Sequence, residues 1–559
     1  MAMPSLADVA LAANKADTHW RLWRPFLKAA RRPRATQEAL LKRILQREED
    51  TDFGRRHGFA GIANFRDYRE TVPVQDYESL RPDIERQRTT GCPRLTQAQP
   101  VIYARTSGTT AAPKDIPVTR AGLERYARGQ RLMAYALNRA APLARGKILG
   151  IGSAAVEGRF FCGTPYGSAS GMIYKSMPRI LRSKYVLPPE VFEIADYDAR
   201  YLTMAALALA ATDVTAVLTA NPSTLLKLQS VIQANADRLI EAVARGRLDL
   251  PPDLAQESWQ SIRQAFRPDA ARARQLDAIL RCGDDWSFAH IWPDLQAIAT
   301  WKGGSCGFAL QPLATKLPER VRLLELGYLA SEMRGTVLAD PERDLCLPLL
   351  QENVFEFVAR ADWEQGRQRF LGLDELAADR QYYLFVTTQD GLYRYDMNDI
   401  VECRGHYEGT PYLAFVQKGR GVTSITGEKL AESQALEAVR QARRVCAAQI
   451  GFFVLLADEI RAGYRFFFEG ASDDLDVRAL SHQVERALRR LNVEYDAKRA
   501  SGRLAPMSCR RLRAGTAEAY RKACVAAGQR DAQFKVKALQ YARDCPFDFE
   551  AHSQWECAA

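Results

Sequence analysis

Helical stretches alternate with short apolar segments through the middle of this 559-residue chain, and this alternation constrains its fold more than any other feature. The apolar segments Lys147–Ile151, Val214–Thr219, Leu295–Thr300 and Leu323–Leu326 have the length and residue types of buried strands. Strands that alternate with helices usually share a sheet that those helices cover. The pattern therefore predicts an α/β fold with mixed sheets and helices.

A second alternation begins after the glycine-containing segment Gln417-Lys-Gly-Arg-Gly421. The change predicts a boundary near residue 420, with a large N-terminal domain over residues 1–419 and a smaller α+β C-terminal domain over residues 420–559. Within the C-terminal part, helical patterns are expected at 432–444 and 477–491, and strands at 450–457 and 464–468.

Local signals predict where several elements start and turn. Thr119 has the side chain of an N-cap residue ahead of a helix to about Arg139, and Thr36 has the same character ahead of a second apolar-periodic stretch. The pair Asp390-Gly391 favours a tight turn. It predicts a hairpin between strands Tyr382–Val386 and Leu392–Tyr395.

Composition and charge exclude several classes of protein. The net charge of +11 raises the possibility of nucleic-acid binding, but the arginines alternate with acidic residues along the whole chain and form no basic stripe. Eleven scattered cysteines without a C-x-x-C pair argue against a disulfide framework and a zinc site, and indicate a reducing, cytoplasmic compartment. The most apolar segment, Met204–Ala211, is too short to cross a membrane. We expect no nucleic-acid partner, no membrane partner and a monomer.

A loop of small and hydroxylated residues, Thr106-Ser-Gly-Thr-Thr-Ala-Ala-Pro-Lys114, lies between the predicted strands Val101–Ala104 and Ile116–Val118. Small residues let backbone N–H groups approach phosphate oxygens, while Lys114 adds a positive charge. Pro113 and Asp115 exclude a Walker A motif, which needs glycine before the lysine and Ser or Thr after it. Taken alone, the loop fits either an anion-binding cradle or a polar connector.

Two further segments carry carboxylates next to predicted strands. Tyr328-Leu-Ala-Ser-Glu332 follows the strand at 323–326, and the end of a strand in an α/β sheet faces the usual ligand crevice. Glu332 could therefore bind the magnesium ion of a nucleotide, since Mg²⁺ takes one or two protein carboxylates together with phosphates. In Tyr393-Arg-Tyr-Asp-Met-Asn-Asp399, the Asp399 carboxylate could accept both ribose hydroxyls, and Arg394 could orient it or meet a phosphate.

These segments, in this order, resemble the signature motifs of the adenylate-forming superfamily. Thr106–Lys114 is similar to its T-S-G-T-T-G-x-P-K motif, Tyr328–Glu332 to Y-G-x-T-E, and Tyr393–Asp399 to Y-R-T-G-D. A closer resemblance is to the auxin-responsive Gretchen Hagen family of acyl acid amido synthetases. Val386-Thr-Thr-Gln-Asp-Gly-Leu-Tyr-Arg-Tyr395 and the Gln533-Phe-Lys535 segment carry it most clearly.

The resemblance implies a large adenylate-forming domain and a mobile C-terminal domain that use ATP and Mg²⁺ to join a carboxylic acid to an amine, which we expect to be an amino acid. It implies catalytic roles for Lys114, Lys429 and Lys535, and a magnesium-binding role for Glu332. Trp301–Ser305 would line the adenine and acyl pockets, and aromatic residues within Arg159–Tyr174 are candidates for the acyl pocket. The implied nucleotide contacts are Thr106, Ser107, Gly108, Thr109, Thr110, Gly303, Gly304, Ser305, Tyr328, Ser331, Glu332, Arg394, Asp399 and Arg420.

Three positions depart from the family pattern. Ala111 and Asn398 stand where glycine is usual, and asparagine tolerates a left-handed backbone better than alanine does. Asp396 places a negative charge where plant relatives often have a basic residue. Besides an amide-forming ligase, the sequence leaves open an acyl-CoA ligase with the same adenylation chemistry and a non-catalytic nucleotide-binding protein.

Overall fold

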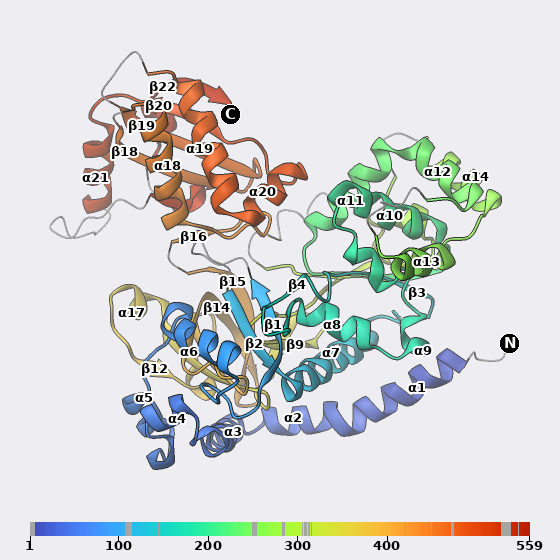
Figure 1. The fold of residues 1–559 in the computed structure, drawn as a ribbon, viewed down its shortest axis with the longest axis horizontal. Helices are drawn as coiled ribbons and strands as arrows, with labels where there is room; N and C mark the ends of the chain where they lie inside the picture. The colour runs from blue at the N-terminus through green and yellow to red at the C-terminus, as the bar shows by residue number, and fades with distance from the viewer. Residues whose placement is uncertain are drawn as a thin grey trace. The chain divides into compact units, whose positions relative to one another are not determined.

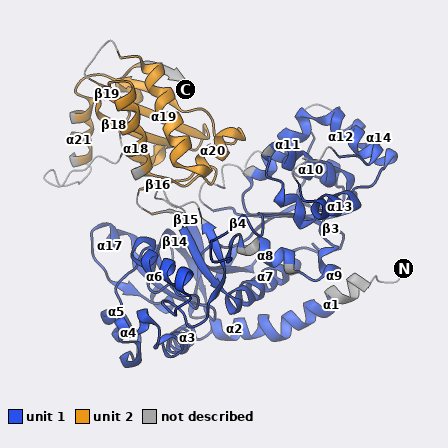
Figure 2. Cartoon of the chain, in the orientation of Figure 1, with its two compact units in different colours: residues 1–106, 114–417 blue, residues 107–113, 418–559 orange. Residues whose placement is uncertain are grey.

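The computed structural model describes residues 6–106, 114–143, 145–248, 254–281, 286–303, 306, 310, 313–314, 316–419, 421–448, 450–470, 475–526, 538–545 and 547–558. The chain divides into two compact units (Figure 2). The N-terminal unit contains residues 1–106 and 114–417, and residues 418–559 belong to the C-terminal unit. Within the described residues, no helix combines the length and apolar character needed to cross a membrane.

A four-stranded parallel sheet in the N-terminal unit contains the predicted apolar strands. β3 (Lys147–Ile151), β6 (Val214–Thr219), β7 (Ala297–Thr300) and β8 (Arg322–Glu325) lie side by side in chain order. Buried side chains from the sheet and from the helices of residues 197–280 form one hydrophobic core. These helices cluster together in green at one side of the unit (Figure 1). The predicted α/β class is thus confirmed.

A second sheet of the N-terminal unit flanks the glycine- and hydroxyl-rich loop. β1 (Pro100–Thr106) and β2 (Lys114–Thr119) are antiparallel, and Thr106 pairs with Lys114. β5 (Pro165–Gly167) and β4 (Gly158–Arg159) complete the order β2-β1-β5-β4, and β1, β2 and β4 are labelled in Figure 1. The register places Thr106 and Lys114, which flank residues 107–113, opposite each other at one end of the β1–β2 pair.

A five-stranded sheet supplies the third part of the N-terminal unit. Its order is β12-β11-β13-β14-β15, from β12 (Phe370–Leu371), β11 (Asn353–Ala359), β13 (Gln381–Thr388), β14 (Tyr395–Tyr407) and β15 (Thr410–Lys418). β9 (Thr336–Asp340) and β10 (Leu345–Pro348) form a separate antiparallel pair. The largest core of the unit packs these elements against the N-terminal helices and α7.

The helices of the N-terminal unit follow the sequence patterns with one local exception. α7 (Arg120–Ala140) begins at the predicted N-cap, where the Thr119 hydroxyl accepts the N–H of Gly122 at 3.0 Å. Thr36 is not a cap, because α3 already begins at Pro33, whose fixed φ suits the first helical turn. The other helices are α1 (Leu6–Thr18), α2 (Arg24–Ala30), α4 (Asp52–Arg56), α5 (Phe65–Thr71), α6 (Tyr77–Thr90), α8 (Ala169–Ser176), α9 (Arg179–Arg182), α10 (Tyr197–Ala210), α11 (Ser223–Ala234), α12 (Ala236–Arg245), α13 (Gln256–Ala265), α14 (Ala270–Leu280), α15 (Phe288–Ile291) and α17 (Arg360–Glu364).

The expected hairpin is present, but its turn is wider than the sequence predicts. β13 and β14 are antiparallel, with Val386 opposite Tyr395, so Leu392–Arg394 lie outside the second strand. The Asp390 carboxylate accepts the N–H of Thr119 at 3.1 Å and pairs with Arg125 at 2.7 Å. These contacts with α7 hold the connection open, because they draw Asp390 away from a two-residue turn.

The C-terminal unit has its own α+β core. A five-stranded sheet of order β21-β18-β19-β20-β22 is covered on one face by α18 (Glu432–Val445) and α19 (Val477–Leu491). Phe466 and Phe468 are buried on that face, and Phe467 on the other. The remaining elements are β16 (Val422–Thr423), β17 (Leu430–Ala431), β18 (Ile450–Asp458), β19 (Gly463–Gly470), β20 (Ser508–Leu512), β21 (Leu539–Tyr541), β22 (Ser553–Ala558), α20 (Val493–Ala500) and α21 (Thr516–Ala526).

Candidate active site

The carboxyl ends of β7 and β8 bring two predicted site segments together. Trp301 follows β7, and its indole N–H donates to the carbonyl of Gly327, which follows β8, at 3.0 Å. Gly303 lies so close to β15 that a Cβ there would be 2.6 Å from the carbonyl oxygen of Phe415. Open α/β sheets bind ligands outside the carboxyl ends of their strands. The segments that directly follow β7 and β8, here called the strand exits, are therefore the structurally favoured place for a nucleotide.

Tyr328 joins the β8 exit to β14. Its hydroxyl donates a hydrogen bond to the carboxylate of Asp399, and its ring stacks on Phe415 with the centroids 6.1 Å apart. Burial and the nearby Asp399 carboxylate raise the pKa of Tyr328 well above its usual value, so the hydroxyl stays a donor. Asp399 is 1% exposed. The contact holds the predicted ribose carboxylate in one orientation.

Lys114 enters the same region from β2. Its ammonium group donates to the hydroxyl of Tyr395 at 3.3 Å, and Tyr395 begins β14. Burial and the negative charges of Glu332 and Asp396 raise the pKa of Tyr395 well above its usual range. The structure therefore gathers Lys114, Glu332 and Asp399 from three separate segments around two neutral tyrosines. Thr106 lies opposite Lys114 in the strand pair, as the backbone register shows.

Glu332 and Ser331 lie in the turn after β8. The carbonyl of Ser331 accepts the hydroxyl of Tyr126 on α7 at 2.8 Å, which fixes the turn, and the Glu332 side chain is partly exposed. No cluster of three or more His, Cys, Asp or Glu side chains that could hold a metal occurs within the described part of the chain. One carboxylate fits Mg²⁺ that arrives with nucleotide phosphates, since this ion keeps several non-protein ligands.

The guanidinium group of Arg394 is engaged by other protein groups, unlike that of an arginine that is available to bind phosphate. Its guanidinium group forms a buried ion pair with Glu356 at 3.1 Å and donates to the carbonyl oxygens of Arg69 and Val72 at 2.9 and 2.7 Å. The backbone of Arg394 has φ = 43°, a left-handed conformation that is uncommon outside glycine. These contacts tie the segment ahead of β14 to α5. A nucleotide contact for Arg394 stays a prediction.

Asn398 and Asp396 show how this chain accommodates its departures from the family pattern. Asn398 has φ = 49°, which explains why glycine suits this position and why asparagine can replace it. Its backbone N–H donates to the Asp396 carboxylate at 2.7 Å. Burial, with the charge of Asp399 adding to it, raises the pKa of Asp396 to about 6, while the Asn398 N–H and Lys114 oppose that rise.

Sequence reasoning missed Glu325, the last residue of β8. Its carboxylate accepts the N–H of Lys302 at 2.8 Å and the N–H of Gly327 at 2.9 Å. Burial raises the pKa of Glu325 to about 7. The available signal was an acidic residue in the otherwise apolar predicted strand Leu323–Leu326, shortly ahead of the Tyr328–Glu332 segment.

The aromatic residues proposed for the acyl pocket separate into different environments. Phe160 packs edge-on against Tyr103 and lies 4.9 Å from the ring of Tyr166, whereas Phe161 is fully exposed. Tyr174 packs against Tyr185 at the border of the other core. Phe160 and Tyr166 thus remain the better placed candidates, since Tyr166 lies in β5 and Phe160 directly follows β4, both in the sheet that contains β1.

The other predicted site residues belong to the C-terminal unit or lie outside the described residues. Lys429 lies in the C-terminal unit between Gly427 and β17 and has φ = 46°. Its neighbour Glu428 is fully buried. The predicted residues that lie outside the described residues are Ser107, Gly108, Thr109, Thr110, Gly304, Ser305, Arg420 and Lys535, together with the departure at Ala111.

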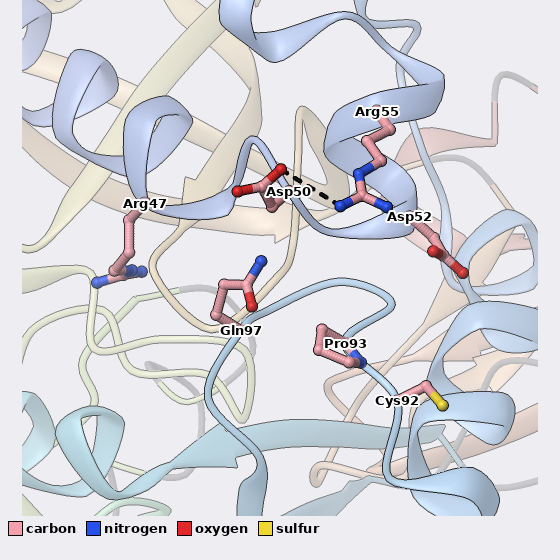
Figure 3. Close-up of a pocket in the computed structure, with 7 residues that line it drawn as sticks. All are labelled: Arg47, Asp50, Asp52, Arg55, Cys92, Pro93 and Gln97. Carbon is pink, nitrogen blue, oxygen red and sulfur yellow. Dashed lines mark hydrogen bonds and ion pairs between the residues drawn. The ribbon is translucent and has the colours of Figure 1, made fainter.

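A surface cavity of about 490 Å³ lies elsewhere in the N-terminal unit, at the end of α3. Figure 3 shows Asp50 paired with Arg55 beside Cys92 and Pro93. The side chains of Asp50 and Arg55 are 72% and 67% exposed, so solvent already satisfies their charges. None of the residues that line this cavity belongs to the predicted nucleotide segments.

Comparison with known proteins agrees with the fold and with the order of the motifs. Residues 23–319 match the GH3 family N-terminal domain, residues 346–418 the central domain and residues 433–544 the C-terminal domain. The chain is 25% identical to indole-3-acetic acid-amido synthetase GH3.4 of Arabidopsis thaliana over 96% of this chain and 94% of that protein. Probable indole-3-acetic acid-amido synthetase GH3.2 of Oryza sativa subsp. japonica is also 25% identical, over 90% and 87% of the two chains.

Among solved structures, the chain resembles AtGH3.15 acyl acid amido synthetase in complex with 2,4-DB, with a TM-score of 0.66 and 19% identity. That match covers 100% of this chain and 99% of the other. A large α/β unit with these strand exits, followed by a smaller α+β unit, is the fold of an adenylate-forming ligase of the acyl acid amido synthetase class. The chain belongs to the GH3 family, because the three matched domains cover most of its length.

Proposed function

We propose that this chain joins a carboxylic acid to the amino group of an amino acid in two ATP-dependent steps. In the first, a carboxylate oxygen attacks the α-phosphorus of ATP, which forms acyl-AMP and releases pyrophosphate. In the second, the amine nitrogen attacks the acyl carbon, the C–O bond to AMP breaks, and the amine loses a proton to water. The products are an amide and AMP.

The observation that supports this proposal most directly is the meeting of Lys114, Glu332 and Asp399 at the strand exits. The first step brings anions together, so it needs fixed positive charge and oriented donors. Lys114 would stabilise charge on the phosphates, together with backbone N–H groups of the 106–114 loop. Asp399, oriented by Tyr328, would accept the ribose hydroxyls.

Glu332 would provide one ligand to Mg²⁺, and the phosphates and water would supply the others. When bound, the ion neutralises phosphate charge as pyrophosphate leaves. Gly303 and the residues after it would approach the adenine and acyl groups. Tight packing against β15 leaves no room for a side chain at position 303, which keeps this strand exit narrow.

We also propose that residues 420–559 are a mobile domain that brings Lys429 and Lys535 to the adenylate. The support is the separate hydrophobic core of the C-terminal unit and the left-handed backbone of Lys429 beside Gly427, with φ of 46° and 100°. Non-glycine residues with a left-handed backbone, such as Lys429, cluster at functional sites. We further propose a cytoplasmic monomer, consistent with described cysteine side chains that are all thiols.

A further part of the proposal is the identity of the carboxylic acid substrate. Relatives are named for indole-3-acetic acid, and one solved structure holds 2,4-DB. We propose an acid of modest size, aromatic or aliphatic, because the rings of Phe160 and Tyr166 pack 4.9 Å apart and form an aromatic pair near β1. The search for substrates should therefore include aryl-alkanoic and short aliphatic acids.

The test is ATP–pyrophosphate exchange across such an acid panel, followed by AMP release with amino acids or with coenzyme A. Exchange that leads to amine-dependent AMP release supports the proposal, and thiol-dependent release would replace it with an acyl-CoA ligase. ATP binding without exchange for any acid would indicate a non-catalytic protein. Lys114→Ala and Asp399→Ala should each lower exchange about 100-fold, whereas exchange by their exposed-site controls, Lys28→Ala and Asp294→Ala, should equal that of the wild type.

A further inference from the structure

Glu325 makes hydrogen bonds to two strand exits at once. One carboxylate oxygen accepts the N–H of Lys302, just after β7, and the other accepts the N–H of Gly327, just after β8. We propose that Glu325 is a positioning residue that holds these exits together, so that Trp301–Gly303 and the Tyr328–Asp399 pair receive the nucleotide in one fixed arrangement. This inference rests on the proposed function of the strand exits.

The two hydrogen bonds that Glu325 accepts from Lys302 and Gly327 are called the clamp here. The surrounding contacts leave the clamp little freedom to move. The indole N–H of Trp301 donates to the carbonyl of Gly327, so the same two exits are joined a second time. Gly327 has φ = 71°, and a Cβ there would lie 2.9 Å from the carbonyl oxygen of Thr336. The turn after β8 is therefore tightly confined, and only the acceptor carboxylate can satisfy both N–H groups from this side.

Glu325 can influence the proposed ribose carboxylate, Asp399, through Gly327 and Tyr328. Gly327 is followed directly by Tyr328, whose own N–H donates to the hydroxyl of Thr336 at 2.8 Å and whose hydroxyl donates to Asp399. A shift of the Gly327 N–H would move the start of the tyrosine backbone. Because catalysis is sensitive to displacements of about 1 Å, such a shift would reach the reaction without direct contact between Glu325 and substrate.

The charges around Glu325 make this clamp sensitive to pH. Burial is the main cause that raises the pKa of Glu325; Asp344 adds to the rise, while the N–H groups of Lys302 and Gly327 and the charge of Lys302 oppose it. The thiols of Cys306 and Cys346 also titrate nearby, and burial, with the negative charge of Glu325 adding to it, raises the pKa of each. Burial places the pKa of Glu325 near 7. Protonation neutralises the group and converts one acceptor oxygen into a hydroxyl, so both N–H groups lose a charged partner and one of them loses its carbonyl-type acceptor.

The experiment compares the wild type with Glu325→Gln between pH 5.5 and 8.5, using ATP–pyrophosphate exchange with the best acid. We expect wild-type exchange to fall on acidification with an apparent pKa near 7. The Gln variant keeps a single acceptor, so its exchange should be about tenfold to 100-fold lower at pH 8 and should lack that acidic limb. Glu319→Gln, at an exposed position ahead of β8, should behave like the wild type.

Hydrogen exchange of the Lys302 and Gly327 backbone amides provides a readout that needs no substrate. After correction for intrinsic rates, their protection should fall in the wild type between pH 8 and pH 6 and should be low at both pH values in Glu325→Gln. Should the Gln variant fail to fold, Glu325→Asp serves instead, because its shorter side chain can reach only one of the two N–H groups.

The outcomes separate the two proposals. If the wild type shows no ATP–pyrophosphate exchange with any acid while its amide protection changes with pH as expected, the proposed function is wrong and the clamp stands. Wild-type exchange in Glu325→Gln at pH 8, or an unchanged acidic limb in that variant, would overturn the positioning role. Amides that stay fully protected in the variant would overturn the clamp itself.

Discussion

The hydroxyl of Tyr328 donates a hydrogen bond to the carboxylate of Asp399, although 71 positions separate the two residues in the chain. Tyr328 leaves the parallel sheet at β8, and Asp399 lies in β14 of a different sheet. The hydrogen bond therefore connects the two sheets at the proposed nucleotide site, and its removal can be tested.

Tyr328→Phe should raise the KM for ATP about tenfold, because a hydrogen bond to a charged group contributes about 1.5–3 kcal/mol. The maximal rate of exchange should change less, since Lys114 is untouched. ATP titration of pyrophosphate exchange measures both quantities. Tyr407→Phe, a change of the same kind near the far end of β14, is the matched control. An unaltered KM in Tyr328→Phe would mean that Asp399 does not bind the ribose.

Asp396→Asn should lower the KM for ATP about fivefold, since it removes a negative charge beside Lys114 worth about 1 kcal/mol at a partly exposed site. The effect should shrink below pH 6, where the raised pKa leaves Asp396 neutral in the wild type as well. Measurements at pH 5.5 and pH 8 test both statements. Asp50→Asn, with a side chain that is 72% exposed in the wild type, controls for overall charge.

Asn398→Gly should leave activity unchanged, because glycine adopts φ = 49° without strain. Asn398→Val should lower the free energy of unfolding by about 1–3 kcal/mol, since β-branched side chains rarely enter the left-handed region. Urea denaturation of the two variants gives the comparison. Equal stability of the Val and Gly variants would show that the backbone at 398 can relax.

Arg394→Ala should lower the free energy of unfolding by about 3–5 kcal/mol, because it leaves Glu356 buried with one of its two arginine partners removed. Thermal unfolding without ligand measures this effect. If Arg394 instead serves mainly the nucleotide, the variant would keep its unfolding temperature and lose ATP affinity. The double variant Arg394→Met/Glu356→Gln should recover part of the lost stability.

Glu325 should make stability depend on pH in a definite direction. Its folded-state pKa is raised, so its contribution is fully present below the unfolded value of 4.5 and is lost as pH rises through about 7. Relative to the wild type, Glu325→Gln should therefore gain stability between pH 5 and pH 8, by at most about 1.4 kcal/mol per pH unit. Urea denaturation of both proteins at pH 5 and pH 8 measures their free energies of unfolding. If the difference between the two proteins is the same at both pH values, the pKa of Glu325 is not raised.

Much of the fold could be predicted from local patterns. Apolar periodicity located β3, β6 and β8, and the Thr119 N-cap located the start of α7. The wide connection at Asp390 and the early start of α3 could not be predicted in this way. The first depends on contacts with Thr119 and Arg125 in a distant segment, and the second on a proline whose fixed φ took precedence over a possible cap at Thr36.

The sequence predicted which segments form the candidate site, but not all the contacts that join them. Motif order indicated that Lys114, Glu332 and Asp399 serve one reaction, and family membership confirms the expected reaction class. The contacts of Arg394 with Glu356 and the double role of Glu325 carry no local signal. A buried ion pair or a clamp between strand exits depends on which elements pack together.

For the 106–114 loop, the sequence alone determined which groups are available, since small and hydroxylated residues followed by a lysine suit an anion-binding cradle or a polar connector. The tertiary structure decided what that lysine meets. Lys114 contacts Tyr395, 281 positions away, because the β2 edge and the start of β14 are packed side by side. Residue types determine which bonds can form, whereas long-range packing selects the few that do.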